Sequence, residues 1–323
     1  MSPAYIRIYP TTNLHVKYFY YQYFDLYQRY IFNELGTGVR STLTYNDLLN
    51  IKVMIPPFNE QKSIAEFIDK KTSQIDTHID KQERLVALLK EQRTAIINKA
   101  VTRGLDENVK LKDSGIDWLG EIPEHWEVRK VSRSFKKIGS GTTPTSGGEL
   151  YYRDGDINWI NTGDLNDGYL YECKNKVTKV ALQHHTSLKL FPPDSLLVAM
   201  YGATIGKVAI SKIDACVNQA CCVLSESKYF MNEFAFYWFM GYRHIIIGLS
   251  YGGGQPNISQ DTIKNLRIPV PPLNEQDTIV EYIKKQNIRV NETISTIEKE
   301  IAPLKEYRQS LISNAVTGKI KVI

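Results

Sequence analysis

Residues 271–276 read Pro271-Pro272-Leu273-Asn274-Glu275-Gln276, and the same pattern occurs earlier in the chain as Pro56-Pro57-Phe58-Asn59-Glu60-Gln61. Placing Pro56 on Pro271 superposes the two stretches. The match then continues without a gap to Thr102 and Thr317, with 20 identities in 47 pairs. Because chance does not produce such a match, the chain contains an internal repeat, and the repeat organises its fold.

The repeat unit runs from one proline pair to the next, and the sequence contains one complete copy and part of another. The same alignment extends backwards, so that residues 1–55 resemble residues 216–270, with Phe19 and Phe24 on Phe234 and Phe239. Nothing in the first copy corresponds to residues 110–215. We therefore expect the sequence to begin partway through a domain whose second version is complete.

Each segment that follows a proline pair predicts a long helix, with Asn59 and Asn274 as expected caps. Apolar residues recur in both segments at heptad spacing, which predicts two seams that bury each other in an antiparallel pair. Pro303 lies inside the second pattern and should kink or divide that helix, because proline lacks the amide donor. The predicted helix-seam residues are Ile68, Ile75, Leu89, Ile96, Ile283, Val290, Ile297, Leu304 and Leu311.

The sequence between the helices changes character and predicts a mixed α/β domain, so that the fold class is α+β. Short β-branched and aromatic runs, such as 157–160 and 196–201, alternate there with Gly, Asp, Asn and Pro turns. We expect the following order along the chain: the C-terminal part of an incomplete first domain (1–55), a long helix (56–104), a linker (105–124), a complete domain (125–270) and a second long, coiled-coil-like helix (271–323).

Composition and charge exclude several classes of protein. A chain of 323 residues with 42% hydrophobic and 23% charged residues is typical of globular proteins. Its formal net charge of +5 is mildly cationic and decides little about its partners. No run approaches the roughly 18 apolar residues of a membrane span, and the first residues lack the layout of a signal peptide, so we expect a cytoplasmic protein. The four cysteines lack the paired spacing of a zinc ribbon or a disulfide framework.

No motif in the sequence supports catalysis or a metal site. Residues 202–208 superficially resemble a phosphate-binding loop, but three residues rather than four separate the glycines, and Val208 follows the lysine. His184 and His185 are adjacent, so they cannot share one face of an element. The acidic residues within 154–167 lie among turn-forming residues. We therefore expect a chain that is not an enzyme and binds no metal.

The loops of residues 125–270 instead offer groups suited to double-stranded DNA. This segment contains 16 Lys and Arg against 12 Asp and Glu. Cationic side chains contact phosphates, whereas amide, hydroxyl and cationic side chains on exposed loops read base edges. A solvated charged surface is the alternative interpretation of the lysines. The candidate DNA-binding residues are Thr142, Thr143, Lys176, Lys179, Tyr201, Thr204, Lys207, Asn218, Gln219, Gln255, Asn257 and Ser259.

Taken in this order, the motifs resemble those of the specificity (S) subunit of a type I restriction–modification system. The resemblance covers essentially the whole chain. It rests on the two proline-pair helix starts and on five further stretches: Trp118-Leu119-Gly120-Glu121-Ile122-Pro123-Glu124-His125-Trp126, Gly141-Thr142-Thr143-Pro144, Trp159-Ile160, Gly202-Ala203-Thr204-Ile205-Gly206-Lys207 and Gly254-Gln255-Pro256-Asn257-Ile258. The family assignment is the hypothesis that the structure must test.

The resemblance implies a fold, partners and a division of chemistry. Residues 125–270 would be a target-recognition domain, residues 1–55 part of another, and the helices a ruler between two halves of a split DNA sequence. The implied partners are double-stranded DNA, type I methyltransferase (M) subunits and a restriction (R) subunit. The chain itself would bind no cofactor, because S-adenosylmethionine, ATP and Mg are expected on the partner subunits.

The shortened first domain leaves several explanations open. The chain could be a truncated recombination product, an incomplete gene copy that serves as a recombination cassette, or a half-length subunit that works as a self-dimer. Two other classes are compatible with the residues: an autonomous enzyme that acts on DNA, and a coiled-coil protein-binding module without DNA contact. The sequence does not identify the bases recognised.

Overall fold

A computed structural model describes residues 8–9, 13–35, 43–144, 148–249 and 257–322 of the chain. The chain divides into two compact units. Unit 1 comprises Met1–Leu89 together with Asn291–Ile323, and unit 2 comprises Lys90–Val290. Two long helices contribute residues to both units.

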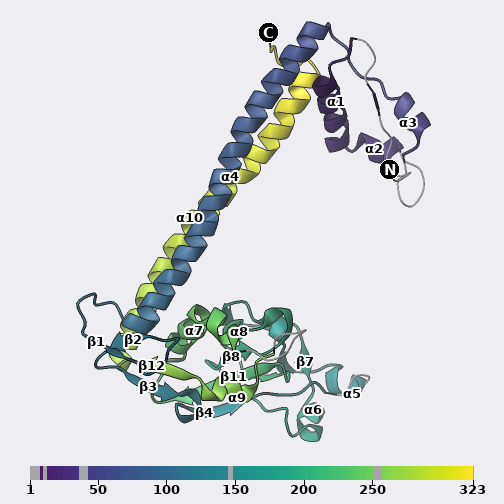
Figure 1. Cartoon of the computed structure of the whole chain (residues 1–323). Helices are drawn as coiled ribbons and strands as arrows, with labels where there is room; N and C mark the ends of the chain where they lie inside the picture. Colours follow the sequence, from purple (N-terminus) through teal and green to yellow (C-terminus); the bar gives the residue numbers. More distant parts are fainter. Residues whose placement is uncertain (1–7, 10–12, 36–42, 145–147, 250–256, 323) are drawn as a thin grey trace. The chain divides into compact units, whose positions relative to one another are not determined.

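The two long helices are α4 (Phe58–Arg103) and α10 (Leu273–Val316), and they pair in an antiparallel sense (Figure 1). In unit 1, the beginning of α4 at Ile64 and Ile68 shares a buried cluster with the end of α10 at Ile312. In unit 2, the end of α4 at Ile97 shares a core with the beginning of α10 at Ile283. The expected pair of long antiparallel helices is therefore confirmed.

Burial along the helices follows the heptad pattern, because each apolar stripe lies against the other helix. Of the nine predicted seam residues, five are buried and four are half-buried. Two ion pairs cross between the helices of unit 1, from Arg308 to Asp76 at 2.7 Å and from Lys305 to Glu83 at 2.9 Å. The buried residues are Ile68, Ile283, Val290, Ile297 and Leu311, and the half-buried ones are Ile75, Leu89, Ile96 and Leu304.

The structure differs from two local expectations about these helices. Asn59 and Asn274 lie within the first turn instead of capping it, because each helix begins at the residue after the second proline. Pro303 does not divide α10, which continues through it as one helix. Proline removes one helical hydrogen bond, but the buried contacts at Ile301 and Ile297 hold this stretch in place.

In unit 1 a buried glutamine fixes a short helix to the long pair. Among the described residues before α4 lie the short helices α1 (Val16–Gln28), α2 (Ile31–Leu35) and α3 (Tyr45–Leu49). The side chain of Gln61 accepts a hydrogen bond from the backbone N–H of His15, the N-cap residue of α1, at 2.8 Å. It donates to the backbone carbonyls of Asn13 and Pro56 at 3.1 and 2.8 Å.

Unit 2 repeats this anchor with Gln276. Its side chain accepts from the N–H of Met231, the N-cap residue of α7, at 2.9 Å, and donates to the carbonyls of Tyr229 and Pro271 at 2.7 and 2.9 Å. Gln61 aligns with Gln276 in the register of the proline pairs, whereas the N-cap residues His15 and Met231 are one position out of that register. The equivalence of Phe19 with Phe234 was therefore wrong by one residue.

The sheets formed by the described residues lie in unit 2. The largest has the strand order β4-β11-β8-β9-β6 and mixes antiparallel pairs with the parallel pair β6 and β9. A second sheet has the order β10-β5-β7, and β12 pairs with β3. The strands are β3 (Glu127–Lys130), β4 (Phe135–Gly139), β5 (Ile157–Ile160), β6 (Gly168–Leu170), β7 (Lys176–Val177), β8 (Leu196–Ala199), β9 (Val208–Ser211), β10 (Ala215–Val217), β11 (Cys221–Ser227) and β12 (Arg267–Val270).

Helices and short 3-10 turns connect these strands, and α7 covers one face of the large sheet. The helix α7 packs against β8 and β9 through its apolar side chains. The expected α+β architecture is confirmed. The connecting elements are η1 (Val131–Arg133), α5 (Glu149–Tyr152), η2 (Thr162–Asp164), α6 (Lys179–His184), η3 (Gly202–Thr204), α7 (Asn232–Gly241), α8 (Arg243–Gly248) and α9 (Gln260–Asn265).

The segment 105–124, expected as a linker, is an integral part of unit 2. It forms a small antiparallel sheet from β1 (Leu111–Asp113) and β2 (Glu121–Pro123). Leu119 and Ile122 are buried in the same core as the helix α7. An apolar pair inside a polar stretch gives a weak sequence signal, which explains why this element was not foreseen.

The different burial of two isoleucines of α10 predicts that alanine substitution destabilises the protein at one position and has little effect at the other. Replacement of Ile283, which is 0% exposed, by alanine should cost about 2–5 kcal/mol because it leaves a cavity. Replacement of Ile288, which is 58% exposed, should change stability by less than about 0.5 kcal/mol. Urea unfolding followed by tryptophan fluorescence measures both changes. Equal effects would contradict the buried position of Ile283.

Candidate nucleic-acid interface

Three polar residues from distant parts of the sequence meet in unit 2. The Thr143 hydroxyl donates to Oε1 of Gln219 at 2.7 Å, and the Tyr201 hydroxyl donates to the backbone carbonyl of Gln219 at 2.7 Å. Gln219 is exposed, so that its amide group faces solvent beside these two partners. The turn between β10 and β11 is thereby tied to the loops that follow β4 and β8.

Backbone hydrogen bonds hold Asn218 and Asn257 close to this position. The N–H of Gly141 donates to the Asn218 carbonyl at 3.3 Å, and the side-chain Oδ1 of Asn218 accepts from Ala220 N–H at 3.1 Å. Asn257 forms an isolated antiparallel bridge with Tyr201. We define Thr143, Tyr201, Asn218, Gln219 and Asn257 as the loop cluster.

The remaining predicted residues lie at different places. The carbonyl of Thr142 accepts from the Trp159 indole at 3.3 Å, next to the loop cluster. The Ser259 side chain caps α9, where it accepts a hydrogen bond from the Thr262 N–H at 2.9 Å. Thr204 and Lys207 belong to the turn between β8 and β9.

The predicted residues Lys176 and Lys179 lie on other elements than the loop cluster. Lys176 lies on β7, and Lys179 begins α6 and forms an ion pair with Asp156 at 3.9 Å. Both lysines are exposed. Gln255 lies outside the described residues.

A basic groove beside the loop cluster was missed by the sequence analysis. It has a volume of about 610 Å³ and shares Gly141 with the loops described above. We call it the basic groove, and its cationic side chains are Lys136, Lys137 and Lys189. Lys189 is far from the other two lysines in the sequence, so no local run revealed them.

Glu226 neutralises part of this groove. Its carboxylate forms ion pairs with Lys137 and, at 3.2 Å, with Lys136. Hydrogen bonds from these two lysines hold the pKa of the Glu226 carboxyl below its usual range. Lys189 also lines the groove, is exposed, and carries the third positive charge. The groove therefore keeps a net positive charge at neutral pH.

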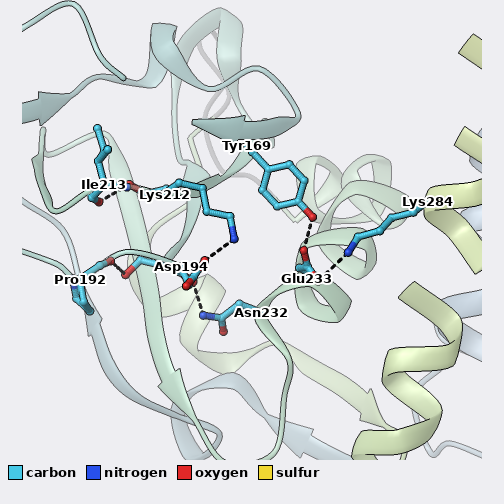
Figure 2. A network of polar contacts seen from close by, with 10 residues as sticks. Tyr169, Pro192, Asp194, Lys212, Ile213, Asn232, Glu233 and Lys284 are labelled. Atoms are coloured by element: carbon cyan, nitrogen blue, oxygen red, sulfur yellow. Dashed lines mark hydrogen bonds and ion pairs between the residues drawn. The ribbon is translucent and has the colours of Figure 1, made fainter. Parts of the chain in front are cut away.

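A polar network joins the sheet and α7 to α10 within unit 2. Figure 2 shows Tyr169 of β6 and Lys284 of α10 both pointing to the Glu233 carboxylate of α7. Burial and the bond to Glu233 raise the pKa of Tyr169. Burial opposes the charge on Lys284, but hydrogen bonds to Glu281 and Glu233 outweigh it and raise the pKa of that ammonium. Through Glu233, this network ties strand β6 of the large sheet and the long helix α10 to α7.

Unit 1 contains the equivalent ion pair with its charges reversed. Lys17 of α1 pairs with Asp69 of α4, at positions that correspond to Glu233 and Lys284. The hydroxyl of Tyr21 donates to the other Asp69 oxygen at 2.6 Å. Burial together with this bond raises the pKa of Tyr21 to about 12. Each unit thus fixes its short helix to a long helix by one ion pair. In unit 1 the cation lies on the short helix, whereas in unit 2 it lies on the long helix.

Other chemistry is sparse in the part of the chain that the structure describes. Within these ranges, His, Cys, Asp and Glu side chains form no group of three that could hold a metal ion. Burial raises the pKa of the Cys216 thiol to about 11 and, as its largest cause, that of Cys222 to about 12, so both are poor nucleophiles at neutral pH. No helix of the described residues combines the length and apolar character needed to cross a membrane.

Comparison with known proteins places these features in one family. The model for the type I restriction modification DNA specificity domain matches residues 2–86 and 123–302. The chain is 26% identical over 285 residues to the putative type I restriction enzyme MjaX specificity subunit of Methanocaldococcus jannaschii, covering 88% of this chain and 62% of that protein. It is 27% identical over 262 residues to the EcoR124I/EcoR124II specificity subunit of Escherichia coli, covering 77% of this chain and 59% of that protein.

A solved structure shares the fold. A chain from a study of complex assembly and conformational transition of the type I R-M system superposes with a TM-score of 0.68 at 17% identity, covering 93% of this chain and 70% of that one. The present chain spans about three fifths of the length of the two relatives it matches. Similarity at this level of identity concerns the architecture.

The reversed ion pairs generate a charge-exchange prediction. Glu233→Lys should destabilise unit 2 by about 1–2 kcal/mol, because it faces Lys284 with a like charge in a half-buried setting. The double variant Glu233→Lys, Lys284→Glu should recover part of this loss, since it reproduces the polarity of Lys17 and Asp69 but places the new carboxylate beside Glu281. Thermal unfolding of both variants measures the coupling. A double variant no more stable than the single one would rule out the pairing.

Proposed function

The chain belongs to the type I restriction modification DNA specificity domain family, and from this premise we propose that it is the DNA-sequence-specificity subunit of a type I restriction–modification complex. The observation that carries the proposal is the loop cluster beside the basic groove, because it combines exposed amides with a cationic surface. Cations position a protein on phosphates, whereas amides read base edges.

The hydrogen bonds of the loop cluster suggest which base edges it reads. Asn218 and Gln219 each use the side-chain oxygen inside the protein, through Ala220 N–H and the Thr143 hydroxyl. Their amide NH₂ groups are then the groups to donate to DNA. Donors recognise N7 and O6 of guanine, N7 of adenine or O4 of thymine in the major groove. We propose that the loop cluster reads acceptor-bearing edges of this kind.

We propose that the chain recruits partners for the chemistry and is itself non-catalytic. Methyltransferase subunits would bind S-adenosylmethionine and methylate adenine, and a restriction subunit would use ATP and Mg to cleave DNA. In this chain the thiols of Cys216 and Cys222 are held protonated at neutral pH, which gives no support for thiol-based catalysis. Co-expression with type I methyltransferase subunits, followed by mapping of methylated adenines, tests the proposal. Methylation that ignores sequence would refute it.

The paired helices support a second element of the proposal, that they act as a ruler. Residues in the seam set which stretch of α4 faces which stretch of α10, as the Asp76–Arg308 and Glu83–Lys305 pairs do. A fixed register gives a fixed reach, just as half-site geometry does in dimeric DNA-binding proteins. We propose that the helix length sets the number of base pairs between the two half-sites.

The loop cluster generates a test by an isosteric substitution. Gln219→Glu keeps the oxygen that accepts from Thr143 but replaces the donating amide with a carboxylate. Loss of a base-edge contact of this kind costs about 1–3 kcal/mol, so affinity for the cognate duplex should fall by about 5- to 150-fold. The same charge change at the exposed residue Gln74 of α4 serves as the control and should leave affinity unchanged.

Lys189→Gln tests the groove separately. Loss of one phosphate contact should weaken binding to all duplexes alike and lower the slope of log affinity against log salt by about 1. Fluorescence anisotropy with cognate and scrambled duplexes at several salt concentrations separates the two effects. A Gln219→Glu variant that retains full affinity and sequence preference would show that the loop cluster is not the reading surface.

The ruler is tested by lengthening both helices together. One heptad inserted at Gln82 in α4 and one at Glu300 in α10, which face each other at 3.5 Å, preserves the seam. Such an insertion adds about 10 Å of helix, or about three base pairs. The methylated sequence should keep both half-sites and gain a longer gap. An unchanged gap would exclude the ruler.

A further inference from the structure

A second cationic groove lies beside the basic groove in unit 2. It has a volume of about 530 Å³, and its cationic side chains are Arg133, Lys136 and Lys228. All three residues are exposed. Lys136 also lines the basic groove, so the two grooves are neighbours at the beginning of β4. We call this site the second groove.

Cationic groups outnumber carboxylates along the two grooves. The ion pairs of the Glu226 carboxylate are with Lys136 and Lys137, so they leave the charges of the other cationic residues in place. A surface with such an excess attracts a polyanion, because each phosphate contact releases counterions. Among the described residues that line the grooves, the acidic one is Glu226, and the cationic ones are Arg133, Lys136, Lys137, Lys189 and Lys228.

Hydrogen bonds and a ring contact hold the walls of the second groove in place. The Ser227 hydroxyl donates to the Ser134 carbonyl at 2.7 Å and accepts from the backbone N–H of Tyr229 at 3.1 Å. Nζ of Lys228 lies 5.0 Å from the centroid of the Tyr229 ring. A cation–π contact restricts this side chain, whereas the ammonium of a fully solvated lysine is free to move. The second groove is therefore a shaped surface as well as a charged one.

The strand β4 leads from the second groove to the loop cluster. Phe135 at its beginning lines the second groove. Gly141, just beyond its end, lines the basic groove and donates its N–H to Asn218 of the loop cluster. β4 lies at the edge of the five-stranded sheet. An extended chain from Lys136 to Gly141 covers about 17 Å, which is the rise of about five base pairs of duplex DNA.

We propose that the second groove holds the phosphate backbone of duplex DNA about five base pairs to one side of the bases that the loop cluster reads. The inference rests on the proposed function, because it takes the loop cluster as the reading surface. Phosphate is the group that fits, since the exposed side chains of this groove include Ser132, Arg133 and Lys228, which suit phosphate oxygens. Such contacts carry no sequence information. They fix the direction in which the duplex leaves the loop cluster.

Ethylation interference with the full chain on a long cognate duplex tests the proposal, because it maps the phosphates that the protein contacts. Interference is expected at the read bases and again about five base pairs to one side. The double variant Arg133→Gln, Lys228→Gln should lose only the second region and lower the slope of log affinity against log salt by about 2. Lys110→Gln with Lys285→Gln removes two exposed charges outside both grooves and should change neither. A second region that is absent, survives the double variant or disappears equally in the control would overturn the proposal.

Glu226→Gln tests the grooves in the opposite direction, so that misfolding cannot imitate the expected result. It removes the carboxylate that neutralises Lys136 and Lys137. Binding to cognate and scrambled duplexes should tighten alike, and the salt slope should steepen by about 1. Unchanged or weaker binding would count against the proposal. If the unmodified chain still prefers the cognate over the scrambled duplex, failure here leaves the proposed function standing, whereas loss of that preference would refute the function itself.

Discussion

The burial of one apolar stripe of α4 against one apolar stripe of α10 is the constraint on which the rest of the protein depends. In unit 1, α1 shares a buried cluster with the two long helices. In unit 2, α7 and strands of the large sheet share a core with them. Helices as long as α4 and α10 gain little from intrinsic propensity, so their stability comes mainly from this packing. Any loss of the seam would remove the support of both short helices.

Both copies of the repeat fix a short helix to a long helix through the same glutamine, but the ion pairs beside this glutamine differ. Gln61 and Gln276 make the same three hydrogen bonds, because a buried amide must satisfy both its donors and its acceptor. The neighbouring ion pairs reverse their polarity from Lys17–Asp69 to Glu233–Lys284. A short helix placed on the wrong long helix would therefore bring like charges together. The reversal thus favours one arrangement of each short helix over the exchanged one.

The sequence predicted those features that depend on local pattern. Heptad spacing and the proline pairs revealed α4 and α10, and alternating apolar runs revealed strands such as β5 and β8. The sequence could not reveal contacts between distant residues, such as Tyr169 with Glu233 or the lysines of the basic groove. In the candidate site, it named the members of the loop cluster, yet it also named Lys176 and Lys179, which lie on other elements. Spacing along a chain does not determine which loops meet.

The loop cluster and the frame follow different physical rules, because the loops expose polar groups whereas the frame is held by buried contacts. Backbone bonds such as Gly141 N–H to the Asn218 carbonyl hold the loops, so that their shape depends little on the exposed side-chain groups. A substitution at Gln219 then alters the donors offered to a ligand without opening the core, because this residue is exposed. A substitution at Gln276 would instead leave the N–H of Met231 unpaired at a buried site, which is far more costly. Variation in binding preference is therefore physically compatible with a constant frame only when it is confined to the loops.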